Sequence, residues 1–465
     1  MNIQGLKSDL RHLDIEDTKA VLKKKSRDFY WFSPILKQDL EKVIGDVIVS
    51  PKDEDELIEA ISAAYRFDVP ITPRGAGTGN YGQAMPLCGG MVLNLLGLND
   101  IFNVQNGAII AGAGASFHEI EAVSKAQLKQ ELRIFPSTYR TASIGGFVAG
   151  GSGGIGSIRW GGLRDLGNIT RVRVVTAEET PRILILEGDE VLKVAHAYGT
   201  NGVITQVELP LTHAHDWVDI IVGFDHFEEA CSFADYVGNQ DGILLKELAV
   251  MAAPIGNSYF PHHSKYVRKD QTTVLLIVAV QNMAALLSII GRRNGEMQFR
   301  SDEVNQNESA NLTPLFECTW NHTTLFAHHN NPDLTYLQIL YPYPNYIDSI
   351  LRIKALLKEE IMDHLEYIRF DGRIVCMGIP LIRFTTEDRL NELIKIYENN
   401  GCIVFNPHRY TLEEGGMKRS DPEQLAYKRQ NDPRGLLNPG KMISWDNPDY
   451  NYSDNQKYLF SGVRG

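Results

Sequence analysis

One glycine-rich stretch decides how the first part of the chain folds: Thr72-Pro73-Arg74-Gly75-Ala76-Gly77-Thr78-Gly79-Asn80-Tyr81-Gly82. The stretch follows a predicted strand at 69–73 and leads into another at 91–95. It contains a literal GxGxxG, but the Rossmann fingerprint also requires a helix that opens directly on the loop, and none is predicted. A Rossmann nicotinamide site is therefore disfavoured. Two alternatives remain, which are an anion-binding nest of main-chain N–H groups and an ordinary glycine-rich turn.

A second glycine cluster follows between Thr141 and Gly162, where nine of the residues are glycine. Ile, Phe, Val and Trp recur within it, which is unlike a flexible linker. A backbone without side chains can lie flat against a large planar ligand. We therefore expect the backbone of this segment to lie against such a ligand.

The pattern of strands and helices predicts an α+β fold in two parts. Up to about Pro210, short apolar strands alternate with amphipathic helices. After it, glycine becomes rarer, and the spacing of apolar residues predicts helices on an antiparallel sheet. The predicted strands are 47–49, 69–73, 91–95, 109–110, 171–176, 183–186, 203–209, 274–280 and 336–341, and the predicted helices are one capped by Asp53 and those at 116–128, 227–237, 348–362 and 387–399.

Composition narrows the class of protein. The 465 residues include 46 Lys and Arg against 58 Asp and Glu, a formal charge of −12 that disfavours binding to nucleic acid. The longest apolar run, residues 274–280, is too short to span a membrane, and the first 25 residues hold no apolar signal core. Five widely spaced cysteines indicate neither a disulfide framework nor a structural metal site. We expect a soluble cytoplasmic protein that binds no metal.

Four motifs in order resemble the FAD-linked oxidases of the vanillyl-alcohol oxidase and p-cresol methylhydroxylase type, and most of all the glycolate-oxidase-subunit-like FAD dehydrogenases. They are Pro73-Arg74-Gly75-Ala76-Gly77-Thr78-Gly79, Pro136-Ser137 through Ile144-Gly145-Gly146, Gly199-Thr200-Asn201-Gly202-Val203-Ile204-Thr205, and Asp432-Pro433 through Leu437-Asn438-Pro439-Gly440-Lys441. Together they cover the chain from about Val47 to Met442.

The resemblance implies an FAD-binding domain with two subdomains and a substrate-binding cap domain with an antiparallel sheet. The expected boundaries are 1–212 for the FAD domain, 213–412 for the cap, and 413–465 for a segment that returns to the FAD domain. The residues implied in FAD binding are Arg74, Gly75, Ala76, Gly77, Thr78 and Gly79 at the pyrophosphate, Pro136, Ser137, Thr141, Ile144 and Gly145 at the pyrophosphate and ribityl chain, Gly150, Gly151, Ser157 and Ile158 near the flavin ring, Gly202, Val203 and Ile204 near adenine, and Asn438 and Lys441 from the C-terminal segment.

Two departures from the family pattern refine these expectations. Thr78 and Gly156 occupy the positions at which some members carry a histidine bonded to the flavin, so we expect non-covalent FAD. The His-x-Gly-Asp-Gly-Asn-x-His and Glu-His-Gly motifs of the metal-dependent members are missing. That difference argues against a metal and against simple glycolate or lactate specificity.

Flavin chemistry on an alcohol needs a base near the substrate hydroxyl and, for an acid substrate, a cation. Our candidates are His322 and His408 as base or substrate ligand, and Arg383 as anion clamp. We predict an FAD-dependent oxidoreductase that moves a hydride from an alcohol, hydroxy acid or sugar acid to the flavin. The alternatives are a flavin-binding protein without turnover and an NAD(P)H-fed reductase. The electron acceptor stays open, and a homodimer is possible.

Overall fold

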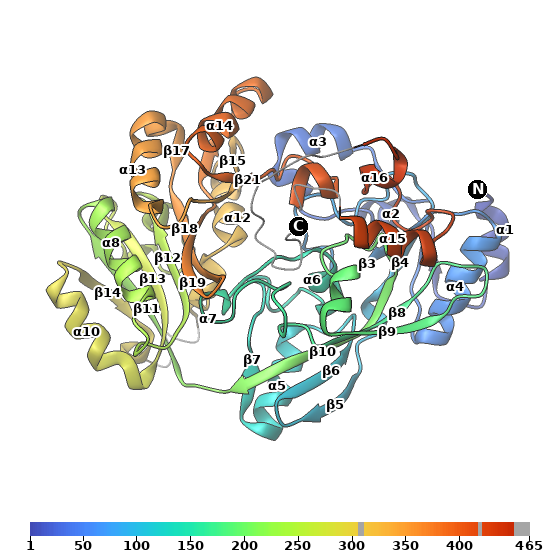
Figure 1. Cartoon of the computed structure of the whole chain (residues 1–465), viewed down its shortest axis with the longest axis horizontal. Helices are drawn as coiled ribbons and strands as arrows, with labels where there is room; N and C mark the ends of the chain where they lie inside the picture. The colour runs from blue at the N-terminus through green and yellow to red at the C-terminus, as the bar shows by residue number, and fades with distance from the viewer. Residues whose placement is uncertain (306–310, 417–420, 451–465) are drawn as a thin grey trace. The chain divides into compact units, whose positions relative to one another are not determined.

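The computed structural model describes residues 1–305, 311–416 and 421–450, which form two compact units (Figure 1). Unit 1 contains residues 1–152, 163–214 and 406–465, and unit 2 contains residues 153–162 and 215–405. The sequence placed the boundaries after residues 212 and 412. In the structure, residues 406–412 belong to unit 1, and residues 153–162 belong to unit 2 although they lie within the second glycine cluster.

The first sheet of unit 1 has the order β1-β2-β4-β3, with β1 (Ile15–Glu16), β2 (Val47–Val49), β4 (Met91–Asn94) and β3 (Ile71–Arg74). β4 is parallel to both β2 and β3, and every residue of β2 and β4 is buried. Such continuous apolar runs are typical of parallel strands covered on both faces. α4 (Glu54–Arg66) packs its apolar side chains into the same core, and its N-terminus is capped by Asp53, which accepts a hydrogen bond from the Glu56 N–H at 2.9 Å.

The C-terminal segment continues this sheet beyond β3. Leu437 pairs in parallel with Ile71. Ile71 N–H donates to Leu436 O at 2.8 Å, and Asn438 N–H donates to Ile71 O at 2.7 Å. The strand that precedes the first glycine loop is therefore fixed by residues about 365 positions later in the chain.

The second sheet of unit 1 has the order β5-β6-β10-β8-β9, and β7 also pairs with β10. Its helix α5 (Phe117–Leu128) begins with a complete capping box between Ser116 and Glu119. The remaining elements of unit 1 are β5 (Ile101–Gln105), β6 (Ala108–Gly112), β7 (Gln130–Leu132), β8 (Arg171–Val175), β9 (Ile183–Glu187), β10 (Val203–His213), α1 (Ile3–Asp9), α2 (Lys19–Lys25), α3 (Pro34–Leu40), α6 (Ile144–Gly150), α15 (Pro422–Asn431) and α16 (Ile443–Asp446).

Part of the second glycine cluster is helical, which the sequence analysis did not predict. Residues 144–150 form α6, and residues 157–160 form the short helix α7 (Ser157–Trp160). Ile144, Phe147 and Val148 lie at helical spacing and are buried, so the glycines of α6 sit among side chains that can anchor a helix.

Unit 2 is built on an antiparallel sheet with the order β14-β11-β13-β12-β18-β19-β16-β21. The predicted α+β class and antiparallel sheet are thus confirmed. The strand predicted at 336–341 is two strands in different sheets, because β15 joins β20 and β17 whereas β16 joins the large sheet. The bounds are β11 (Trp217–Phe224), β12 (Leu245–Met251), β13 (Thr272–Ala279), β14 (Glu296–Arg300), β15 (Leu334–Tyr336), β16 (Gln338–Leu340), β17 (Ile361–Met362), β18 (His364–Phe370), β19 (Arg373–Gly378), β20 (Leu381–Arg383) and β21 (Ile403–Phe405).

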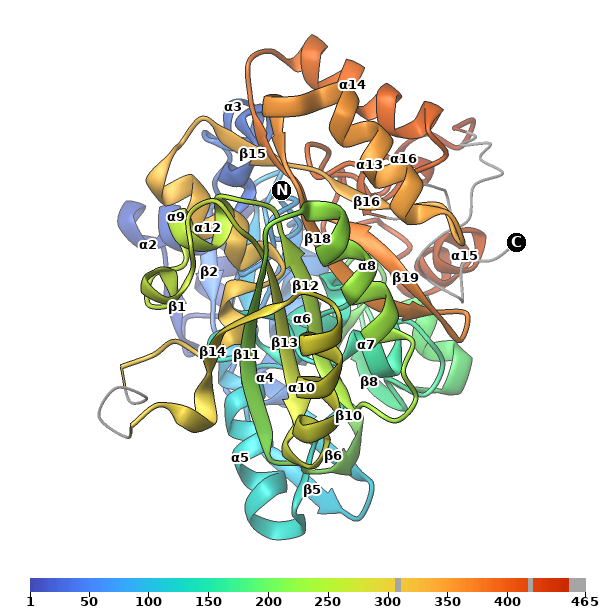
Figure 2. The ribbon, with the colours of Figure 1, turned by 90° about the vertical axis from the view of Figure 1, so that its left-hand side faces the viewer.

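Helices cover both faces of this sheet. α8 (Phe227–Gly238) buries Phe233 and Val237 against the strands, and α10 (Met283–Arg292) lies on the same side (Figure 2). A separate apolar cluster joins β11, β12 and β13 to α9 (Ile255–Tyr259) and α12 (Asn321–Asn330). With both faces covered, all eight residues of β13 are buried. The other two helices are α13 (Tyr346–Leu357) and α14 (Glu387–Asn399).

Candidate functional site

The first glycine loop leaves β3 at Arg74 and reaches β4 without forming a helix. Gly77 has a φ of +70°, in the left-handed region that favours glycine. A Cβ atom at this position would lie 2.1 Å from Nη2 of Arg74 and 3.0 Å from Arg27 O. The loop therefore folds closely over the arginine side chain, and a larger residue at 77 has no room.

The guanidinium of Arg74 binds main-chain carbonyl groups, two of which belong to the loop itself. It donates from Nη1 to Gly75 O at 2.9 Å and from Nη2 to Ala76 O and Arg27 O, both at 3.2 Å. Burial lowers the pKa of this guanidinium, and the Asp28 carboxyl opposes the shift. Because Arg74 binds the carbonyl groups, its positive charge lies beside a loop whose N–H groups are left for other partners.

Those N–H groups are available. Within the described ranges, the amides of residues 76–79 donate to no other residue. The neighbouring Ser143 hydroxyl is buried and has no hydrogen-bond partner among the same residues. A Cβ atom on Gly75 would lie 2.0 Å from that Oγ, so the loop and Ser143 are in close contact. Backbone and hydroxyl donors that converge in this way suit an anion.

Ser143 also precedes the first turn of α6, so a helix from elsewhere in the chain begins beside the loop. The first two amides of this helix are already used, because Ile144 N–H donates to Ala115 O at 2.9 Å and Gly145 N–H donates to Ala113 O at 2.8 Å. The start of α6 therefore offers the loop the Ser143 hydroxyl rather than these two amides.

Two buried ionisable groups lie beside the far end of the loop. Nζ of Lys441 donates to Gly82 O at 2.6 Å, and Asp28 accepts from Tyr30 N–H at 3.0 Å and Ala84 N–H at 3.2 Å. Burial lowers the pKa of Lys441 to about 7, although the Asp28 carboxylate opposes this shift. Burial likewise raises the pKa of Asp28 to about 6, against its main-chain bonds and Lys441. Both groups thus titrate close to neutrality.

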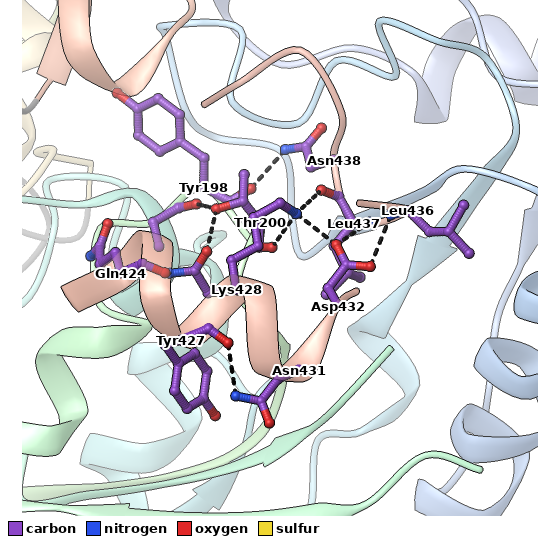
Figure 3. A network of polar contacts seen from close by, with 12 residues as sticks. Tyr198, Thr200, Gln424, Tyr427, Lys428, Asn431, Asp432, Leu436, Leu437 and Asn438 are labelled. Carbon is purple, nitrogen blue, oxygen red and sulfur yellow. Dashed lines mark hydrogen bonds and ion pairs between the residues drawn. The ribbon is translucent and has the colours of Figure 1, made fainter. Parts of the chain in front are cut away.

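The third and fourth sequence motifs are joined by one buried lysine (Figure 3). Nζ of Lys428 donates to Thr200 O at 2.8 Å and to Leu437 O at 3.2 Å, and it pairs with Oδ2 of Asp432 at 2.6 Å. Asp432 in turn accepts from the N–H groups of Leu436 and Leu437 at 2.9 and 3.0 Å. Burial lowers the pKa of the lysine and raises that of the aspartate, and each partner opposes the shift of the other. These bonds connect the third motif, at residues 199–205, to the fourth, at residues 432–441, although more than 200 residues separate them in the sequence.

Asn438 connects this network to the first glycine loop. Its Nδ2 donates to Gln83 O at 2.8 Å and to Tyr198 O at 2.7 Å (Figure 3 shows the bond to Tyr198). Its Oδ1 is buried and has no partner among the described residues. Asn438 therefore fixes the loop and still has an acceptor to offer.

Comparisons with known proteins indicate FAD as the cofactor of the part of the chain that contains this loop. Residues 45–183 match the family model described as an FAD binding domain. This match agrees with the resemblance of the sequence to the FAD-linked oxidases over the first part of the chain. The chain is 25% identical over 202 residues to a D-lactate dehydrogenase of Anaerostipes hadrus, a match that covers 40% of the chain and 41% of the relative. It is 26% identical over 180 residues to the glycolate oxidase subunit GlcD of Bacillus subtilis (strain 168), which covers 36% and 37%. The chain thus spans about two fifths of these relatives.

The fold is likewise shared with a solved alkyldihydroxyacetonephosphate synthase. The two chains superpose with a TM-score of 0.70 at 14% identity, over 95% of this chain and 86% of the other. At this identity the likeness concerns the fold alone. It confirms the predicted α+β fold over most of the chain.

The residues of unit 1 fit FAD, the cofactor of this family. A pyrophosphate needs several hydrogen-bond donors in a small space, and the amides of 76–79 and the Ser143 hydroxyl supply them without losing any bond of the protein. The charges of Arg74 and Lys441 lie behind and beside the same loop. The loop therefore provides what a dinucleotide pyrophosphate requires.

The other residues predicted to bind FAD lie in several different elements of the structure. Ser137 is buried and Thr141 is exposed, in the turn in which Thr141 N–H donates to Thr138 O at 2.9 Å. Gly150 ends α6, and Gly151 O contacts Nδ1 of His196 at 2.8 Å. Pro136 is half-buried, and Gly202, Val203 and Ile204 are buried at the start of β10. Their roles stay predictions.

Ser157 and Ile158 are on α7 and belong to unit 2, whereas Gly150 and Gly151 belong to unit 1. Both α7 residues are buried, and Ser157 Oγ accepts from Gly154 N–H at 3.0 Å. The proposed contact of these four residues with one flavin stays a prediction.

The three catalytic candidates are likewise divided between the units. His408 is in unit 1, buried, with its Nδ1 2.7 Å from Ser33 Oγ. His322 lies in the first turn of α12 in unit 2, and burial lowers its pKa to about 4, against a bond to the main chain of Glu317. Arg383 ends β20 in unit 2 and is exposed. Its charge acts on Tyr259 of α9, where it opposes the rise in pKa that burial causes.

Metal ligands and membrane spans are not found in the part of the chain that the structure describes. Within residues 1–305, 311–416 and 421–450, no three His, Cys, Asp or Glu side chains are grouped so that they could hold a metal ion. Over the same ranges every helix is too short or too polar to span a bilayer.

Sequence reasoning missed several residues that shape the candidate FAD site. Ser143 has the residue type and place of a helix N-cap, and this signal could have located α6. Lys428 stands four residues before Asp432, which is the spacing of an ion pair on one helix face. Gln83 and Asp28 carry no signal in the sequence, because their contacts are with residues far away or with the main chain.

Proposed function

We propose that the protein is an FAD-dependent oxidoreductase that oxidises the CH–OH group of an alcohol, hydroxy acid or sugar acid, with FAD bound non-covalently. One observation carries the proposal, namely the loop of four adjacent amides, residues 76–79, that no other described residue uses. The names of the relatives, D-lactate dehydrogenase and glycolate oxidase subunit, support a hydroxy acid as substrate class. The missing metal motifs favour a substrate other than the simplest of these acids.

The residues of this chain divide the work as follows. The amides of 76–79 and the Ser143 hydroxyl bind the pyrophosphate, and Asn438 keeps the loop in place through Gln83 O. Bound FAD supplies a ring that accepts a hydride. His322 is uncharged at neutral pH because burial lowers its pKa, so it can accept the substrate hydroxyl proton. His408 is the second candidate for this proton, and Arg383 is the candidate for binding a substrate carboxylate.

Unit 2 is proposed as the substrate domain and unit 1 as the cofactor domain. A cytoplasmic location and a homodimer accompany the proposal as predictions. Thr78 has no imidazole to bond to the flavin, and Gly156 has no side chain at all, which supports non-covalent binding.

The test starts with the visible spectrum of the purified protein after incubation with FAD. We expect flavin absorbance that remains after gel filtration and moves entirely to the supernatant on acid precipitation. An anaerobic panel of alcohols, hydroxy acids and sugar acids should then contain a compound that bleaches the flavin. A protein that stays colourless contradicts the cofactor assignment. A yellow protein that no CH–OH compound bleaches supports the alternative, a flavin-binding protein without turnover.

A further inference from the structure

Two carboxyl groups in unit 2 face each other inside the protein. Glu247 is on β12 and Glu366 on the neighbouring β18, with 3% and 0% of their surfaces exposed. Glu366 stands opposite Ala249 in the register of the two strands. Glu247 is two residues from Ala249, so both side chains leave the same face of the sheet. Both carboxyl groups accept hydrogen bonds from the same residue, Trp320, so they lie close together.

Two buried carboxyl groups this close to one tryptophan favour a proton shared between them. Ionised carboxylates are acceptors only, so two of them have no hydrogen to share. Two negative charges side by side in the interior would also repel each other without solvent to screen them. We therefore expect one of the two carboxyl groups to be protonated. Burial raises the pKa of both groups, to about 8 for Glu366 and well above the usual range for Glu247, where the charge of Glu366 adds to the effect.

The pair holds one tryptophan at two points. Trp320 N–H donates to Oε1 of Glu366 at 2.6 Å, and Trp320 Nε1 donates to Oε2 of Glu247 at 3.3 Å. Both contacts are to oxygen atoms, so the indole and the main chain are oriented together. Oε1 of Glu247 also accepts from Leu248 N–H at 3.2 Å.

Trp320 needs to be held, because its backbone is strained. Its φ of +51° and ψ of −143° lie in a region that residues with a side chain rarely occupy. Such a conformation costs about 1–3 kcal/mol and persists only where the surroundings impose it. Trp320 is also the residue before α12, whose first turn carries His322.

We propose that Glu247 and Glu366 share a single proton and act as a positioning pair, which holds Trp320 in its strained conformation and thereby fixes the start of α12. Loss of the shared proton leaves two repelling carboxylates, which separate and release the indole. The arrangement is a proton-operated latch within unit 2, and it does not depend on the proposed catalytic function.

The groups around the pair fit this role. On β18, His364 contacts Oε1 of Glu366 through Nε2 at 2.5 Å, and burial lowers the pKa of this histidine to about 3, so it adds no charge. On β19, the buried thiol of Cys376 is also held neutral, because burial raises its pKa. Among the cations on the adjoining elements, Lys246 of β12 lies over the Trp217 ring at 5.3 Å and Arg159 of α7 lies over the Trp160 ring at 4.7 Å.

The test is a pH titration of tryptophan fluorescence on the full-length flavin-loaded protein. The chain has five tryptophans, so the signal of Trp320 is the difference between wild type and Trp320→Phe. We expect this difference to change in one transition between pH 7 and 10. Glu247→Gln and Glu366→Gln imitate the protonated acid, so each should keep the low-pH signal throughout and lose the transition. Glu131→Gln, a change of a buried carboxyl in unit 1, should leave the transition intact.

Infrared spectroscopy keeps the proposal falsifiable if one Gln variant fails to fold. Wild type at neutral pH should show the C=O band of a buried carboxylic acid, which either Gln variant should lack. The proposal fails if wild type lacks this band, if Trp320 shows no transition below pH 10, or if both Gln variants titrate like wild type.

Discussion

Lys428 and Asp432 form a buried ion pair, with 2.6 Å between Nζ and Oδ2 and side chains that are 2% and 0% exposed. The lysine also binds Thr200 O and Leu437 O, so this pair joins the segment after residue 199 to the C-terminal segment. The attraction between the two charges adds little to the stability of the protein, because the cost of burying them largely offsets it. Removal of one partner is strongly destabilising, because it leaves a buried charge without a counter-charge.

We expect Lys428→Met to lower the free energy of unfolding by about 3–5 kcal/mol, because it leaves the Asp432 carboxylate buried without a partner. Chemical denaturation followed by circular dichroism measures this change. Lys193→Met removes a more exposed lysine, paired with Glu190, and should cost at most about 1 kcal/mol. Equal effects of the two substitutions would contradict the role assigned to Lys428.

Gly75→Ala should abolish tight FAD binding. The added Cβ would lie 2.0 Å from Ser143 Oγ, so either the loop shifts or the Ser143 hydroxyl rotates away, and in both cases the donors no longer converge. A rise in the Kd for FAD of at least tenfold is expected, measured by quenching of flavin fluorescence. Gly242→Ala is the matched control, since nothing lies within 4 Å of its Cβ. Unchanged affinity in Gly75→Ala would place the pyrophosphate elsewhere.

Ser143→Ala separates ligand binding from stability. The hydroxyl has no partner among the described residues, and no side-chain bond from it caps α6, so its removal should not destabilise the protein without FAD. It should weaken FAD binding by about 1 kcal/mol, or roughly fivefold, which is the usual contribution of one hydrogen bond. Thermal unfolding without FAD and titration with FAD give the two values. Lower thermal stability with unchanged FAD affinity would show that Ser143 is structural.

FAD affinity should fall as the pH rises from 7 to 9. Lys441 has its pKa lowered to about 7 by burial, so in the free protein it loses its charge over this range. The anionic pyrophosphate favours the protonated lysine, so binding takes up a proton and weakens at high pH. Asp28, with a pKa of about 6, is ionised throughout this window and adds little to the slope. Lys441→Met should bind FAD more weakly and with no such slope; a slope equal to that of wild type would assign the effect to another group.

His322→Ala and His408→Ala should each keep FAD, and the substitution of the true base should abolish bleaching by substrate. Because His322 is uncharged down to a pH of about 4, activity that depends on it should fall only at acid pH. Rapid mixing under anaerobic conditions measures the rate of flavin reduction. Wild-type rates in both variants would remove both histidines from the mechanism.

Local patterns in the sequence predicted local structure well. The strand at 47–49 and the helix at 387–399 have the expected bounds, since each depends on apolar spacing and, for the helix, a threonine cap. α6 was missed because its glycines hid the helical spacing of Ile144, Phe147 and Val148. The strand expected at 336–341 is divided because Leu334–Tyr336 and Gln338–Leu340 pair with different partners, a property of the whole fold.

The candidate site, like the fold, could be predicted only where local sequence patterns define it. The glycine loop could be located from its residues, but the bonds that shape it come from distant positions. Asn438 reaches Gln83 O over 355 residues, and Lys441 reaches Gly82 O over 359. No periodicity in a single sequence reports such contacts.

The pairing of Leu437 with Ile71 has a consequence for the order of events during synthesis. β3 and the glycine loop leave the ribosome early, but the segment that borders β3 and binds the loop through Asn438 is translated hundreds of residues afterwards. A nascent chain that lacks that segment also lacks the hydrogen bonds that hold the first glycine loop in shape. If the loop binds the pyrophosphate as proposed, we expect flavin to load only after the C-terminal segment has been made, and a chain that ends before residue 438 should remain an apoprotein even though every glycine of the loop is present.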